Sequence, residues 1–106
     1  ILATPVRDTM KRGADNFIQA TVEREDLWHA LTPQMFPTLQ LKNSIEQAFD
    51  APAVITDEAS AIEFAGGKSQ LISSSSENIK ITHPDDLALA EFIINKQSTT
   101  NVQEKQ

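Results

Sequence analysis

The stretch Asn78-Ile79-Lys80-Ile81-Thr82-His83-Pro84-Asp85 indicates the fold class, because it joins a strand pattern directly to a helix start. Its alternation predicts a strand at 78–82, with Ile79 and Ile81 on the buried face and Lys80 on the other. Open α/β sheets bind ligands beyond the carboxyl ends of their strands, and Lys80 stands at such a position. On position alone, a solvated lysine on an edge strand is the simpler interpretation.

Strand and helix patterns alternate along the chain, which predicts an α/β fold. Thr82 and Asp85 have capping-box spacing, so a helix is expected to begin here. Thr56 is expected to be the N-cap of an earlier helix that stops at Gly66-Gly67. The remaining expected elements are a strand at 1–6, an apolar stretch at 27–31, a helix opened by Pro37-Thr38 and a strand at 70–73.

A projecting hairpin is predicted near the N-terminal end of the sequence. Gly13-Ala14-Asp15-Asn16 is a turn cluster, and Phe17 to Arg24 alternates between an apolar and a polar face. An isolated two-stranded arm is marginally stable in water. We therefore expect this arm, at about 7–26, to pack on another subunit.

Charge and composition exclude several classes of protein. The net charge is −6, which argues against a nucleic-acid partner, although Arg7, Lys11 and Arg12 make residues 1–12 locally basic. There are no cysteines and two histidines, so neither a thiolate zinc site nor a histidine-rich metal site is expected. No apolar run approaches transmembrane length, so the expected location is the cytoplasm, with no membrane partner. The chain opens on Ile1, which we interpret as the start of a piece of a longer protein.

Four features could bind an anion such as a phosphate monoester. Thr9, with Arg7, Lys11 and Arg12, places donors on the outgoing half of the arm, and Arg24 ends the incoming half. Thr56 would place a hydroxyl beside the amides of a helix N-terminus, and Lys80 would add an ammonium group. Each has an ordinary alternative, since Arg24 could pair with a neighbouring glutamate and Thr56 could be a structural cap only.

These residues lie in blocks that resemble the 2-C-methyl-D-erythritol 4-phosphate cytidylyltransferase family. The resemblance covers nearly the whole chain, in order, and corresponds to the C-terminal half of that enzyme. The matching blocks are Pro5–Arg12, Thr21–Arg24, Leu27–Gln34, Ile55–Ala61, Asn78–Thr82 and, from Pro84 onward, Asp86–Glu91.

The resemblance implies a Rossmann-like α/β domain that dimerises through the β-arm. It implies transfer of a cytidylyl group from CTP to methylerythritol phosphate, with Mg²⁺, in non-mevalonate isoprenoid biosynthesis. By motif match, Arg24 and Lys80 are the expected catalytic residues, and Thr9, Thr32 and Thr56 are expected substrate contacts. In the dimer, Thr9 and Arg24 would serve the site of the partner.

The resemblance also implies what this chain lacks. The Gly-rich loop for CTP and the metal-side carboxylate belong to the other half of the family's domain, so this chain alone is expected to be inactive. The arm between Arg12 and Thr21 is short for the family. We expect a partial domain at 1–97 and a disordered tail at 98–106. The alternative is a non-catalytic dimerisation or anion-binding module.

Overall fold

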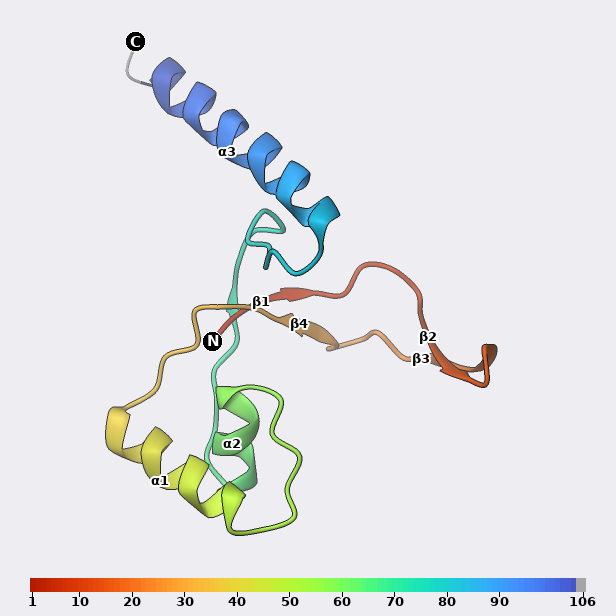
Figure 1. The fold of residues 1–106 in the computed structure, drawn as a ribbon, viewed down its shortest axis with the longest axis vertical. Helices are drawn as coiled ribbons and strands as arrows, with labels where there is room; N and C mark the ends of the chain where they lie inside the picture. Colours follow the sequence, from red (N-terminus) through yellow and green to blue (C-terminus); the bar gives the residue numbers. More distant parts are fainter. Residues whose placement is uncertain (105–106) are drawn as a thin grey trace. The chain divides into compact units, whose positions relative to one another are not determined.

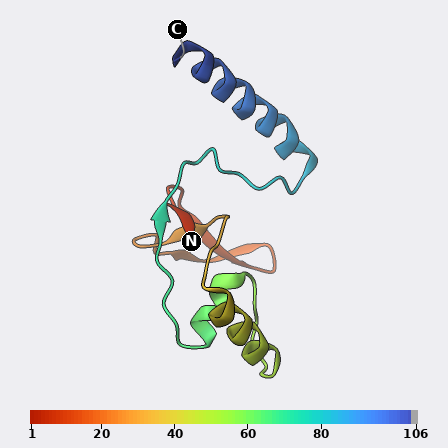
Figure 2. The same ribbon diagram turned by 90° about the vertical axis from the view of Figure 1, so that its left-hand side faces the viewer.

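A computed structural model describes residues 1–104 of the chain as a mixed α/β protein (Figures 1 and 2). It divides into two compact units, one of residues 1–74 and one that begins at Ser75. The elements in chain order are β1 (Leu2–Pro5), β2 (Met10–Ala14), β3 (Phe17–Val22), β4 (Trp28–Ala30), α1 (Thr38–Phe49), α2 (Glu58–Phe64), β5 (Ile72–Ser73) and α3 (Pro84–Glu104). The α/β class predicted from the alternation of strands and helices is confirmed.

The first unit contains a three-stranded sheet in the order β4-β1-β5. The central strand β1 is antiparallel to β4, with Ala3 opposite Ala30, and parallel to β5, with Leu2 opposite Ile72. Ala3 is fully buried. The connection from β4 to α1 is tied to the same strand, since Leu31 donates to the carbonyl of Leu2 at 2.9 Å.

β2 and β3 form a separate hairpin arm, which projects beyond β1 and β4 in Figure 1. Its two-residue turn is Asp15-Asn16, with φ of 52° and 67°. Left-handed residues at both turn positions match the twist of a hairpin, and Asp and Asn tolerate this conformation well. The register shifts between Arg12 and Gly13, as in a β-bulge. The expected turn is therefore confirmed, and the arm ends in a tight turn.

The helices α1 and α2 pack against each other and form most of the buried core of the first unit. Ala48 of α1 and Ala59, Ala61 and Ile62 of α2 are buried. α2 ends as expected at Gly66, whose φ of 85° suits a glycine after the last helical turn. A Cβ at Gly67 would lie 2.8 Å from Cγ2 of Ile62, so a larger residue there would disturb the core.

The second unit differs from expectation at 78–82, which the alternation predicted as a strand. Among the described residues this segment pairs with no strand and is irregular. A strand requires a neighbour for its backbone hydrogen bonds, and hydropathy alternation alone does not provide one. The alternation does hold in part, because Ile79 and Ile81 line one hollow while Lys80 is exposed.

Two further expectations about the second unit are corrected. Asp85 was expected to complete the cap of α3, but Asp86 does so by accepting from the backbone of Thr82 at 3.0 Å and His83 at 2.9 Å. The tail expected to be disordered from Ser98 is helical to Glu104. Within this helix, Thr99 donates to the carbonyl of Asn95. Residues 105–106 of that expected tail lie outside the described residues.

Candidate functional site

Thr9 and Arg24 lie at the same end of the arm. The last pair of the arm ladder is Met10 with Val22, and Thr9 and Arg24 lie one and two residues beyond it. Nη1 of Arg24 donates a hydrogen bond to the carbonyl of Arg7, across the base of the arm. Both candidate side chains are exposed, so the arm base presents a hydroxyl and a guanidinium to the surroundings.

Thr32 and Thr56 flank a second junction, between the end of β4 and the start of α2. Thr32 follows β4 and precedes a cis peptide bond to Pro33. Thr56 lies two residues before α2, and both threonines are exposed. The link between these segments is Gln34, whose Nε2 donates to Oδ2 of Asp57 at 3.0 Å and to the carbonyl of Leu31 at 3.3 Å.

The N-cap of α2 is Asp57, so the expectation that Thr56 caps this helix is wrong by one residue. Oδ1 of Asp57 accepts from the backbone N–H of Ser60 at 2.8 Å, and the Ser60 hydroxyl accepts from the backbone N–H of Asp57. The carboxylate takes this place because it reaches the third helical residue from the capping position.

This cap also changes the expected anion site at the N-terminus of α2. The Ser60 amide is bound by Asp57, and the Ala59 amide donates to Oε1 of Gln34 at 3.0 Å. Two of the first-turn amides that could have bound an anion are therefore already satisfied. Any contribution of Thr56 to anion binding must come from its own hydroxyl and not from these amides.

Asp57 is held in its charged form. The hydrogen bond from Gln34, joined by the bonds from Ser60, lowers the pKa of Asp57 below its usual value against the opposing effect of burial. A carboxylate that accepts several hydrogen bonds resists protonation. The cap and its link to Gln34 therefore persist across the neutral pH range.

Thr56 also borders a hollow of about 210 Å³ between the end of α1 and the start of α2. Its apolar wall includes Phe49, which is 77% exposed. The lining residues are Ile45, Phe49, Ile55, Thr56, Asp57 and Glu58. Thr56 thus lies where an apolar surface meets two carboxylates.

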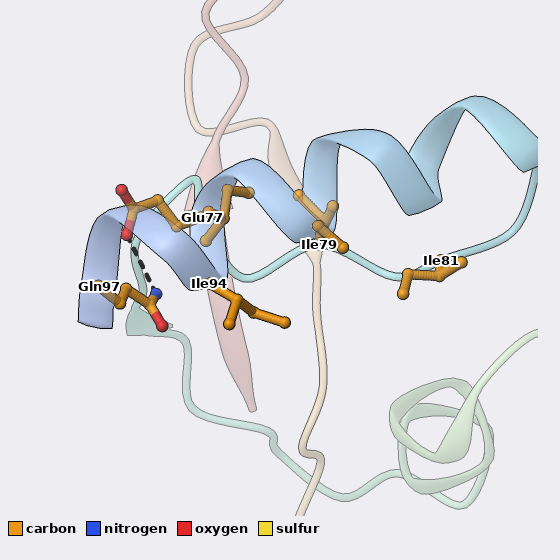
Figure 3. Close-up of a pocket in the computed structure, with 7 residues that line it drawn as sticks. Glu77, Ile79, Ile81, Ile94 and Gln97 are labelled. Carbon is orange, nitrogen blue, oxygen red and sulfur yellow. Dashed lines mark hydrogen bonds between the residues drawn. The ribbon is translucent and has the colours of Figure 1, made fainter. Parts of the chain in front are cut away.

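Lys80 belongs to the second unit, in the irregular segment before α3. A hollow of about 250 Å³ is lined by residues on either side of it, and Figure 3 shows Ile79, Ile81 and Ile94 at this hollow. At one end Glu77 accepts from Gln97 at 3.3 Å and pairs with Lys96 at 2.6 Å. The bond from Lys96, with the bond from Gln97, lowers the pKa of Glu77.

The five expected site residues therefore fall into three groups. Thr9 and Arg24 share the arm base, Thr32 and Thr56 flank the Gln34 junction, and Lys80 lies in the second unit. Sequence reasoning did not identify Gln34 or Asp57 as a bridge. The available signal was the position of Gln34 directly after Thr32-Pro33. Hydropathy does not predict the contact between Gln34 and Asp57, which are 23 positions apart in the sequence.

The described residues also bear on metal binding and on membrane insertion. Among them, no group of three or more His, Cys, Asp or Glu side chains is placed to hold a metal ion. No helix in the described part of the chain has the length and apolar character needed to cross a membrane.

Two known proteins that are similar to this chain carry the same name. The protein from Colwellia psychrerythraea called 2-C-methyl-D-erythritol 4-phosphate cytidylyltransferase is 64% identical over 107 residues, which cover 92% of this chain and 44% of that protein. The protein of the same name from Pectobacterium atrosepticum is 58% identical over 96 residues, covering 91% and 40%. The chain thus spans about two-fifths of the length of these relatives.

Solved structures give the same result. The Francisella tularensis 2-C-methyl-D-erythritol 4-phosphate cytidylyltransferase superposes with a TM-score of 0.82 at 36% identity, covering 88% of this chain and 44% of that one. A crystal structure of 4-diphosphocytidyl-2C-methyl-D-erythritol synthase gives a TM-score of 0.77 at 41% identity, covering 89% and 42%. The sequence model described as 2-C-methyl-D-erythritol 4-phosphate cytidylyltransferase matches residues 1–96, and this chain therefore belongs to that family.

Proposed function

We propose that this chain supplies the substrate-positioning and dimerisation elements of an enzyme that transfers CMP from CTP to 2-C-methyl-D-erythritol 4-phosphate. The observation that carries the proposal is the family match over residues 1–96, a range that contains all five candidate site residues. The reaction is a step of non-mevalonate isoprenoid biosynthesis and releases pyrophosphate. The cytoplasmic location expected from the sequence stays a prediction.

The chemistry requires two polyanions to approach each other. An oxygen of the methylerythritol phosphate attacks the α-phosphorus of CTP, a new P–O bond forms, and the bond to pyrophosphate breaks. Such a reaction depends mainly on positioning and on neutralising charge. In the proposal, Arg24 provides a planar guanidinium that can bind two phosphate oxygens, and Lys80 provides a point charge. Thr9, Thr32 and Thr56 provide hydroxyl groups that orient the substrate.

The proposed partner is a second copy of the chain, bound through the arm. Phe17 and Ile18 at the arm tip are 79% and 69% exposed, although apolar side chains of this size favour burial. Lys11 is already engaged within the hairpin, where its Nζ donates to Oγ1 of Thr21 at 2.7 Å. The exposed apolar tip supports an arm that packs on another subunit.

The resemblance implies Mg²⁺, which would neutralise charge on the triphosphate when bound. The part of the chain that the structure describes brings no three metal-binding side chains together, so it offers no site that would hold the ion by protein ligands alone. The proposal therefore assigns no step of this chain's residues to the metal. The ion would be held mainly by the part of the family's domain that this chain does not span.

The proposal is tested by pyrophosphate release from a chimera. In the chimera, the segment of the Colwellia psychrerythraea protein that matches this chain is replaced by this chain, which is 64% identical to it. We expect pyrophosphate release that requires both CTP and methylerythritol phosphate. The chain of 106 residues by itself should release none.

The unmodified Colwellia protein is the control for assay conditions. If the chimera folds and dimerises but releases no pyrophosphate while the control does, the catalytic proposal is wrong. That result would favour the alternative, a non-catalytic dimerisation or anion-binding module.

A further inference from the structure

Gln34 uses both ends of its side-chain amide to join two segments that are distant in sequence. Its Nε2 donates to Oδ2 of Asp57 at 3.0 Å, and its Oε1 accepts from the Ala59 amide at 3.0 Å. The same Nε2 donates to the carbonyl of Leu31 at 3.3 Å. One half-buried side chain thus holds the segment after β4 against the first turn of α2.

The residues that Gln34 binds are the direct neighbours of two candidate substrate contacts. Leu31 precedes Thr32, and Asp57 follows Thr56. The Thr32 segment is also fixed from the sheet side, since Leu31 donates to Leu2 at 2.9 Å and Leu2 donates to the carbonyl of Pro33 at 3.4 Å. Gln34 therefore connects Thr56, through Asp57, to a segment already tied to the sheet.

We propose that Gln34 is a positioning residue for the transfer reaction, which holds the Thr32 and Thr56 segments in one fixed arrangement for the substrate. This inference rests on the proposed function. Gln34 itself makes no proposed contact with the substrate and acts through Asp57 and Leu31.

The chemistry of the junction explains why an amide is needed there. Asp57 offers an acceptor and the Ala59 N–H is a donor, so the bridging side chain must carry one donor and one acceptor. A glutamate would face the Asp57 carboxylate with a second carboxylate. A leucine would leave both partly buried groups without their hydrogen bonds, which is costly.

Exchanging the donor and the acceptor between Gln34 and Asp57 tests whether their hydrogen bond, and not packing alone, positions the two segments. In the chimera, Gln34→Glu places two carboxylates face to face, and Asp57→Asn places two amide donors face to face. The double variant Gln34→Glu with Asp57→Asn restores one donor opposite one acceptor between these two residues, whereas the bond to the Leu31 carbonyl stays lost. The Asp57→Asn side chain would still accept from the Ser60 amide, because asparagine is as good an N-cap as aspartate.

We expect each single variant to raise KM for methylerythritol phosphate about tenfold, with a smaller change in kcat, and the double variant to regain part of the loss. KM for CTP should change little in every variant. Gln34→Leu should resemble the single variants. Gln47→Leu on the exposed face of α1 is the matched control, and it should behave as the unsubstituted chimera.

Melting curves of all variants identify losses that come from unfolding. The inference is overturned if folded single variants keep the KM of an active chimera, or if the double variant is no better than the worse single one. An inactive unsubstituted chimera overturns the proposed function, and this inference with it. The two failures are distinguishable, because the positioning role of Gln34 can fail by itself only when the unsubstituted chimera is active.

Discussion

Lys80→Ala in the chimera should lower kcat/KM for methylerythritol phosphate roughly 100- to 1,000-fold. This is the typical cost of losing one preorganised group that stabilises negative charge in the transition state. Lys80 is exposed in the irregular segment before α3, and its neighbours Ile79 and Ile81 line a hollow against that helix. Truncating its side chain therefore removes a charge without opening the packing. We expect the loss mainly in the response to methylerythritol phosphate.

Two further variants make the Lys80 result specific. Lys80→Arg keeps the positive charge but changes its shape and reach, so it should recover part of the lost activity. Lys68→Ala removes an exposed lysine of the first unit and should leave kcat/KM within about twofold, since isolated surface charges contribute little. If Lys80→Ala has no more effect than Lys68→Ala, Lys80 does not act on the substrate.

Arg24→Ala should reduce kcat/KM for methylerythritol phosphate by a similar factor, roughly 100- to 1,000-fold. The bond to the Arg7 carbonyl uses one of the five N–H donors of the guanidinium and holds the side chain at the arm base. Arg24→Lys should recover little, because an ammonium group cannot bind two phosphate oxygens in a planar fork.

The control for Arg24 is another arginine on the same arm. Arg12 is exposed in β2, and Arg12→Ala removes an equal charge from the same hairpin. We expect its effect on kcat/KM to remain within about threefold, since Arg12 is not among the five residues that the family resemblance assigns to the site. Equal losses from Arg12→Ala and Arg24→Ala would indicate a general effect of arm charge, and would contradict a specific role for Arg24.

The parts of the fold that the sequence predicts well are those set by local chemistry. The hairpin turn follows from Asp15 and Asn16, which tolerate positive φ, and the end of α2 follows from Gly66. The segment at 78–82 was predicted less well, because its alternation is real but a strand also needs a partner along its edge. Propensity and spacing contain no information about that partner.

The candidate site shows the same division between local and tertiary information. The two predicted caps were each wrong by one residue: Asp57 takes the place expected for Thr56, and Asp86 the place expected for Asp85. Neighbouring residues can each cap a helix, and sequence spacing does not determine which of them has the right geometry. Gln34 was missed because its partners lie on a different segment. The roles of the five site residues came from the family resemblance and await the tests above.

The most direct test of the shared-site account is to mix Arg24→Ala and Lys80→Ala chimeras and measure pyrophosphate release. If Arg24 serves the site of the partner subunit, random exchange should restore about a quarter of the unsubstituted activity, because about half of the dimers are mixed and each holds one intact site. Mixed dimers are verified by pulling down one variant through an affinity tag. No recovery in verified mixed dimers would contradict a site built from the arm of one subunit and the body of the other.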